Sequence, residues 1–113
     1  MAGRLTITEN ALAALLALAA HEVPGVVGMA PAGLKEQVVR ILGRQEASEG
    51  VVVRPDPAAP GKYQVDFYVV VAVGARIPTV VESLAERVGF AAKRLAGVEL
   101  SQVRVHVVGV GRG

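Results

Sequence analysis

Residues 63–73 alternate between two kinds of side chain with a period of two, which predicts a long β-strand. One face of this strand would be apolar or aromatic throughout, with Tyr63, Val65, Phe67, Val69, Val71 and Val73. The opposite face would carry Gln64, Asp66, Tyr68, Val70 and Ala72. Because that second face is polar only in its first half, we expect one end of it to be exposed to water and the other to be covered.

A helical period of three to four residues replaces the alternation after Gly74, the residue at which we expect the strand to end. Pro78 suits the first turn of a helix because its ring fixes φ near the helical value. Gly97 is the predicted C-terminal end of this helix. The apolar face of the helix is expected to consist of Ile77, Val81, Leu84, Val88, Ala91 and Leu95.

A second alternation follows this helix and predicts another strand. Its two faces would carry Val103, Val105 and Val107 on one side and Arg104, His106 and Val108 on the other. The glycine-rich tail GVGRG is expected to fray into solvent.

The N-terminal part of the chain predicts a second long helix. The segment 5–8 alternates as a short strand or extended lead-in, and Thr8 is a natural N-cap with Glu9 in the first helical turn. Pro24 and Gly25 are the turn residues that end this helix. The helical apolar positions are Leu12, Leu15, Leu16 and Ala19.

The middle of the chain predicts shorter elements. Val26 and Val27 would form a brief strand that passes into a loop, and Leu34–Leu42 would form a short helix capped by Gly43. Val51–Arg54 is a predicted strand, and the proline- and glycine-rich residues 55–61 would join it to the long strand as a hairpin.

These elements predict a single domain over residues 1–113 with an α+β fold. The expected architecture is a two-layer sandwich, in which two main helices cover one face of a small mixed sheet of three to four strands. The exposed face of that sheet, which also carries Gln64, is then the best candidate for contact with another molecule. The residues predicted to form this contact surface are Asp66, Tyr68, Arg104 and His106. The turn and cap positions are Pro24, Gly25, Gly74, Pro78 and Gly97.

Composition limits the chemistry. Hydrophobic residues make up 52% of the 113 residues and aromatic residues only 4%, so the core must be aliphatic and few rings are available to stack on bases or sugars. The absence of cysteine excludes a thiolate nucleophile and a thiolate metal site. The net charge of +2 is weak for a nucleic-acid-binding protein. The apolar run 11–20 is too short to span a bilayer and no secretory signal is evident, so we expect a cytoplasmic protein.

Each candidate chemical site has a simpler structural interpretation. His21 and His106 are isolated histidines without the spacing of metal ligands, and Asp66 is explained by an outward-facing strand position. The glycine clusters 25–33 and 109–113 lack the pattern of a phosphate-binding loop, so turns and a tail explain them better. We therefore predict no catalytic, cofactor or metal site.

A basic patch is a further candidate. It would consist of Lys35, Arg40, Arg44 and Arg54 and could bind RNA or anionic lipid. Glu36, Glu46 and Glu49 dilute this charge, which favours a solvated helix face.

Four segments together are similar to a known family. They are LTITENALAALLALAAHEVPGVVGM, GVVVRP, YQVDFYVVVAVGARIPTVVESLAERV and LAGVELSQVRVHVVGV, and they extend over nearly the whole chain. In their order and spacing they resemble the alkaline shock protein family of Gram-positive and related bacteria, also called the envelope stress response family. None of the segments is a catalytic motif.

The resemblance implies a small cytoplasmic α+β protein without known enzymatic activity that self-associates and is linked to cell-envelope homeostasis and to alkaline or general stress. In some members it also implies attachment to the membrane through an integral-membrane protein partner. It supplies no catalytic residue, no cofactor and no small-molecule substrate.

Three hypotheses of function follow from the sequence. The leading one is a non-catalytic scaffold or adaptor that binds itself and an envelope-associated partner. RNA binding is the alternative from another class, and it predicts affinity that falls steeply with salt. An enzyme acting through Asp66 or His106 is the third.

Overall fold

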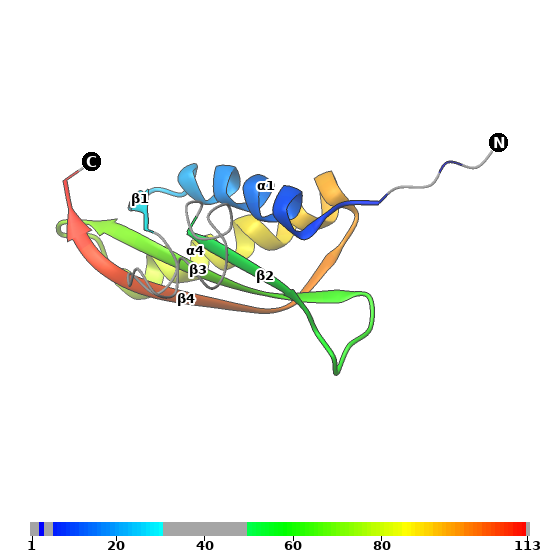
Figure 1. Cartoon of the computed structure of the whole chain (residues 1–113). Helices are drawn as coiled ribbons and strands as arrows, with labels where there is room; N and C mark the ends of the chain where they lie inside the picture. The colour runs from blue at the N-terminus through cyan, green and yellow to red at the C-terminus, as the bar shows by residue number, and fades with distance from the viewer. Residues whose placement is uncertain (1–2, 4–5, 31–49, 113) are drawn as a thin grey trace.

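The computed structural model describes residues 3, 6–30 and 50–112. Its elements are α1 (Glu9–His21), β1 (Val26–Met29), β2 (Val51–Pro55), β3 (Lys62–Ala72), α4 (Ile77–Ala91), the π-helical turn η2 (Ala92–Ala96) and β4 (Glu99–Gly111). Figure 1 shows α1 and α4 packed together along the sheet. The predicted two-layer α+β sandwich with two main helices is confirmed.

Two segments predicted from the sequence are not confirmed as predicted. The predicted helix Leu34–Leu42, with Gly43 as its cap, lies outside the described residues. Of the predicted lead-in 5–8, the described part 6–8 is not a strand. It is extended only as the approach to α1, where the Thr8 side chain accepts a hydrogen bond from the Ala11 N–H and caps the helix as expected.

β3 lies in the middle of the sheet. One of its edges pairs antiparallel with β1 near Val71 and with β2 near Phe67. Its other edge pairs in parallel with β4 along its whole length, from Lys62 opposite Glu99 to Ala72 opposite Gly111. The sheet is therefore mixed, as predicted, and the hairpin of β2 and β3 is confirmed. α4 supplies the crossover that a parallel pair of strands requires.

β1 and β2 follow one another along the same edge of β3, and they meet at Tyr68. The N–H of Ala30 donates to the carbonyl oxygen of Tyr68, and the N–H of Tyr68 donates to the carbonyl oxygen of Gly50, both at 2.9 Å. A Cβ atom at Gly50 would lie 2.7 Å from the Ala30 oxygen, so only glycine fits there. Ala30 and Gly50 therefore meet at the same residue of β3.

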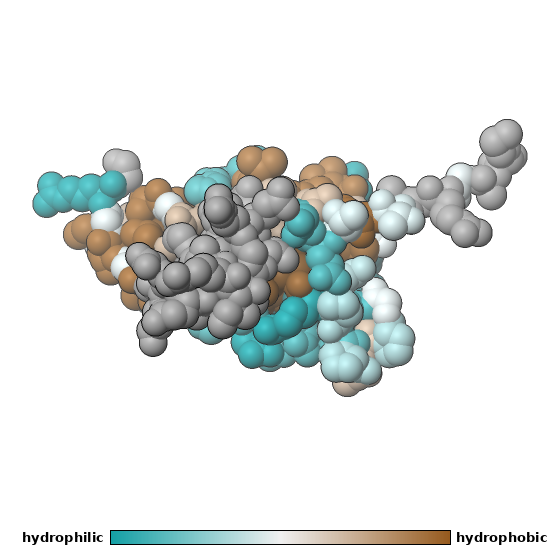
Figure 2. Space-filling view, viewed as in Figure 1, coloured by the Kyte–Doolittle hydropathy of each residue, from teal (hydrophilic) through white to brown (hydrophobic). Residues whose placement is uncertain are grey.

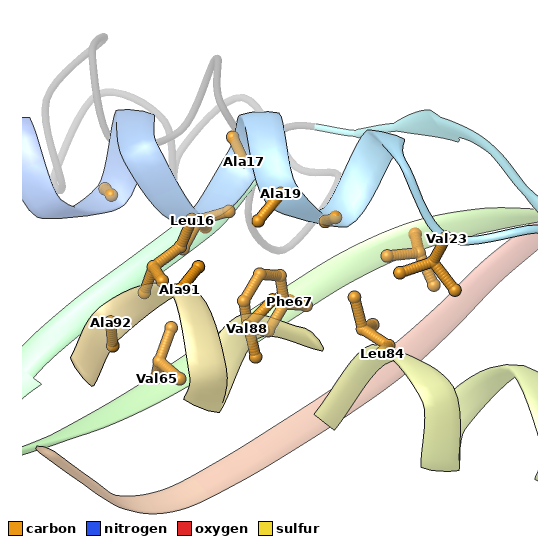
Figure 3. Close-up of a cluster of buried hydrophobic side chains, with 14 of the residues drawn as sticks. Leu16, Ala17, Ala19, Val23, Val65, Phe67, Leu84, Val88, Ala91 and Ala92 are labelled. Carbon is orange, nitrogen blue, oxygen red and sulfur yellow. The ribbon is translucent and has the colours of Figure 1, made fainter. Parts of the chain in front are cut away.

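The core lies between β3 and the two helices. Figure 3 shows Val65 and Phe67 of β3 in one cluster with Leu16 of α1 and Val88 of α4. Phe67 is fully buried and is the largest buried side chain among the described residues. Four alanines of α1 are also buried, which allows its backbone to approach the sheet closely. The core is accordingly aliphatic around one buried aromatic ring, as the composition indicated.

The predicted apolar face of α4 needs a correction. The buried residues are Val80, Leu84, Val88 and Ala91, whereas Ile77 is 41% exposed and Val81 only half-buried. Leu95, which we expected in the core, is 71% exposed. The π-helical turn explains this last difference, because i→i+5 bonding adds a residue to the turn and brings Ala96 rather than Leu95 to the core.

The C-terminal tail was also predicted wrongly. Gly109, Val110 and Gly111 belong to β4, and the N–H of Val73 donates to the carbonyl oxygen of Gly111 at 3.0 Å. Residues 109–111 are held in the sheet because β3 extends far enough to pair with them. Val73 itself is 62% exposed rather than inward-facing, since β3 ends at Ala72. Figure 2 shows apolar surface at this end of the sheet.

The turn and cap residues sit at the ends of the elements. Gly97 ends η2 in the left-handed conformation, Gly74 follows β3, and Pro78 lies in the first turn of α4. Pro24 and Gly25 form the turn from α1 to β1. Gly25 has φ +98°, and a Cβ atom there would lie 2.6 Å from Cγ2 of Val80, so this turn requires glycine for both conformation and space.

Candidate contact surface

The sheet face turned away from the helices gathers the four residues that the sequence indicated. In the parallel register, Asp66 lies opposite Arg104 and Tyr68 lies opposite His106. Because alternate residues of a strand share a face, these two neighbouring rows form one cluster. We call Arg54, Asp66, Tyr68, Arg104 and His106 the contact cluster.

Asp66 is the centre of the contact cluster. Its Oδ2 accepts a hydrogen bond from Nη2 of Arg54 at 2.7 Å, and its Oδ1 lies 2.9 Å from Nε2 of His106. Nε of Arg104 lies 3.9 Å from the same Oδ1. The Asp66 residue is only 4% exposed, although we expected it on a wet face, because its three partners cover it. A buried carboxylate is tolerated when it is paired and hydrogen-bonded in this way.

His106 is held from two sides. Its ring stacks on Tyr68 with the centroids 4.6 Å apart and the planes 13° from parallel. Because a carboxylate oxygen accepts hydrogen bonds, the contact with Asp66 assigns the donor role to Nε2 of His106. The Asp66 contact and the stacking together fix the orientation of the imidazole.

Arg54 is the member of the contact cluster that sequence reasoning placed elsewhere. It was grouped with Lys35, Arg40 and Arg44, which lie outside the described residues. In the β2–β3 hairpin Arg54 pairs with Gln64, so Asp66 is its diagonal neighbour on the same face. The hairpin register was the signal that could have joined Arg54 to Asp66.

The contact cluster presents two arginines and a histidine around a covered carboxylate. The side chains of Arg54, Arg104 and His106 are 48%, 46% and 42% exposed, whereas that of Asp66 is 6% exposed. Asp66 therefore orients these three side chains, and they remain reachable from solvent. Such an arrangement suits the binding of carboxylates or phosphates on another molecule.

A second polar contact fastens the β2–β3 turn to β4. The hydroxyl of Ser101 donates to Oδ2 of Asp56, and the N–H of Ala58 donates to Oδ1 of the same residue. The Ser101 hydrogen bond, helped by that of Ala58, holds the pKa of Asp56 below its usual value of 3.8. This contact lies at the end of the sheet where Tyr63 and Ser101 meet.

The other residues considered as chemical sites do not join the contact cluster. His21 is exposed in the last turn of α1. Gly109 and Gly111 pack against Val70 in the sheet. Among residues 3, 6–30 and 50–112, no three His, Cys, Asp or Glu side chains gather as a metal site would require. Within the same ranges, none of the helices has the length and apolar character needed to cross a bilayer.

Comparison with known proteins identifies the family to which the chain belongs. The model of the alkaline shock protein 23 family, described as having a cell envelope-related function, matches residues 1–112. An uncharacterized protein of Streptococcus pyogenes serotype M6 is 29% identical over 106 residues, which cover 93% of this chain and 85% of that protein. No solved structure is a significant match.

Proposed function

Because the chain belongs to the alkaline shock protein 23 family, whose function is cell envelope-related, we propose that it is a non-catalytic adaptor. In this proposal it resides in the cytoplasm, self-associates, and binds an envelope-associated protein through the contact cluster. Binding a membrane-anchored partner would bring it to the envelope during alkaline or general stress.

The orientation of Arg54, Arg104 and His106 by the hidden Asp66 carboxylate is the observation that carries the proposal. Long cationic side chains normally lose conformational freedom on binding, and a contact that already orients them reduces this loss. The stacked Tyr68 ring adds flat apolar area beside the charges. We therefore propose a partner segment that carries carboxylates and an apolar or aromatic side chain.

The composition of the contact cluster favours binding over catalysis. Asp66 and His106 resemble the orienting pair of a general base, since Nε2 lies 2.9 Å from Oδ1. A general base also needs a group to activate. In the described chain, however, the hydroxyl of Ser101 bonds to Asp56 and to the backbone of Tyr63 instead of to His106, and Tyr68 lies against the face of the imidazole ring. The adaptor proposal needs only the charges and shape that the cluster presents.

RNA binding is the second candidate, and the same cluster supports it. Two exposed arginines beside a stacked Tyr68–His106 pair could hold a phosphate next to a base. The carboxylate of Asp66 weighs against it, because it neutralises part of the local positive charge. RNA binding predicts retention that weakens steeply between low and physiological salt, whereas the adaptor is expected to bind its partner at physiological salt.

The test is affinity purification of the tagged chain from cells of its native source, with the envelope fraction solubilised in mild detergent. Wild-type protein is expected to retain a protein partner that Arg104→Gln loses. Arg76→Gln is the matched control, since it removes the same charge from an exposed residue that makes no side-chain cap bond. Equal retention by wild type and Arg104→Gln would rule out the contact cluster, and nuclease-sensitive retention would favour RNA.

A further inference from the structure

An apolar groove lies in the helical layer, between α1 and the end of α4. It has a volume of about 720 Å³, and its apolar walls include Leu15 and Leu18 of α1 together with Phe90 and Leu95. Three of these side chains are unusually exposed: Leu18 by 71%, Phe90 by 61% and Leu95 by 71%. Exposed apolar side chains gathered in this way mark an interaction site more often than scattered ones do. Figure 2 shows apolar surface along this upper side, where α1 and η2 lie in Figure 1.

The charge changes sign across this groove, with Phe90 in the middle. Glu86, Phe90 and Arg94 follow one another at spacings of four along α4 and η2, and all three are exposed. Phe90 also lines the neighbouring hollow that contains Glu86, while the guanidinium of Arg94 lies 5.5 Å from the Phe90 ring centroid. We call these three residues the α4 stripe.

The acidic and basic ends of the α4 stripe are available for a partner. Arg87 and Glu22, which line both hollows, form an ion pair with each other. Within the described chain neither Glu86 nor Arg94 is part of an ion pair. The stripe therefore offers one negative charge and one positive charge on opposite sides of an exposed ring.

We propose that a second copy of this chain docks on the groove through antiparallel pairing of the two α4 stripes. A two-fold axis beside Phe90 would bring the two Phe90 rings together and place Glu86 of each copy opposite Arg94 of the other. An isologous interface requires such self-complementarity, because each contact occurs twice. Leu18 and Leu95 of both copies would then be covered. This inference rests on the self-association in the proposed function and assigns it to a surface.

The helical layer lies on the other side of the sheet from the contact cluster. A dimer formed through the α4 stripe therefore leaves both contact clusters open. A two-fold dimer with two open clusters would bind a clustered partner with higher avidity than a single chain.

The test measures sedimentation equilibrium of purified full-length chains over a range of concentrations. Wild type is expected to dimerise, whereas Glu86→Arg and Arg94→Glu each weaken the dimer by at least about tenfold, because each places like charges opposite one another twice. Mixing these two variants should restore a one-to-one dimer. The α4 stripe of the Glu86→Arg chain carries two positive charges, and the α4 stripe of the Arg94→Glu chain carries two negative charges, so opposite charges face each other again. Glu82→Arg, one turn further along the exposed side of the same helix, is the matched control and should dimerise as wild type does.

A second measurement does not depend on charge. The chain has no cysteine, so Phe90→Cys introduces a single thiol beside the two-fold axis and should form a covalent dimer on mild oxidation, whereas Glu82→Cys should not. A wild-type dimer that both charge variants leave unchanged would place self-association elsewhere and overturn this inference alone. A wild-type protein that stays monomeric would overturn both this inference and the proposed self-association. The proposed binding of a partner by the contact cluster would still stand or fall on the affinity purification.

Discussion

Arg54 and Asp66 are joined across neighbouring strands, with Nη2 of Arg54 at 2.7 Å from Oδ2 of a carboxylate that is almost fully covered. Arg104 and His106 approach the same carboxylate from β4 on the other side. Asp66 therefore links three adjacent strands through one side chain. The same link organises the contact cluster, so stability and binding depend on Asp66 together.

Replacing Asp66 by Asn tests this link. The amide keeps the shape but loses the negative charge that attracts Arg54 and Arg104 and accepts the His106 hydrogen bond, and we expect the free energy of unfolding to fall by about 1–2 kcal/mol. This expected loss of stability is modest because the three partners of Asp66 are partly exposed and water can solvate them. Urea denaturation measures it, with Arg54→Met as the comparison, which should cost less because Arg104 and His106 remain. Unchanged stability of Asp66→Asn would show that the link is not a stabilising one.

The Asp56–Ser101 contact predicts a pH dependence. The pKa of Asp56 is lower in the folded chain than its usual 3.8, so this contact stabilises the fold above the unfolded-state pKa. That contribution is lost as the pH falls through the folded-state pKa. Urea denaturation of wild type and Ser101→Ala from about pH 6 downward should show a difference in stability that narrows below pH 3.8. A difference that is constant with pH would contradict the assigned cause.

The two phenylalanines of the chain provide a matched pair. Phe67 is fully buried among both helices and the sheet, whereas Phe90 is 61% exposed. Phe67→Ala should lower the free energy of unfolding by about 3–5 kcal/mol, because it removes apolar contacts and leaves a cavity. Phe90→Ala should change it by no more than about 0.5 kcal/mol, as expected for a surface side chain. Thermal unfolding followed by circular dichroism under conditions that keep the chain monomeric compares them.

Substitution of Gly25 and Gly74 by alanine separates two costs of adding a Cβ atom, the cost of the left-handed backbone conformation and the cost of a steric clash. Both have positive φ, +98° and +84°, but an added Cβ atom meets Val80 only at Gly25. Gly74→Ala should therefore cost about 1–2 kcal/mol for the left-handed conformation alone. Gly25→Ala should cost more, and pairing it with Val80→Ala should recover part of the excess. If the two single variants lost equal stability in urea denaturation, the close approach of Gly25 and Val80 would be unimportant.

Most of the fold could be predicted because its periodicity is simple. The alternation around Phe67 indicated the central strand and its buried face, and the same alternation placed Asp66, Tyr68, Arg104 and His106 on the opposite face. Their convergence into one cluster follows from the parallel register of β3 and β4. That part of the candidate surface needed only the prediction of a strand–helix–strand unit.

The parts that could not be predicted depend on tertiary structure. A regular helical period places Leu95 inward, but the π-helical turn changes which residues face the core. The tail glycines have low strand propensity, yet β3 gives them a partner. Arg54 required the pairing register of the hairpin, which its turn sequence did not specify. Each difference arises where contacts between elements override a local preference.

The meeting of Ala30 and Gly50 at Tyr68 makes one edge of the sheet continuous. β1 and β2 act as two halves of a single edge strand, with Tyr68 of β3 as the anchor that both share. Because Tyr68 also stacks on His106, the anchor adjoins the contact cluster. Tyr68 therefore serves two structures at once: its backbone joins the two halves of the edge strand, and its ring orients His106 in the contact cluster.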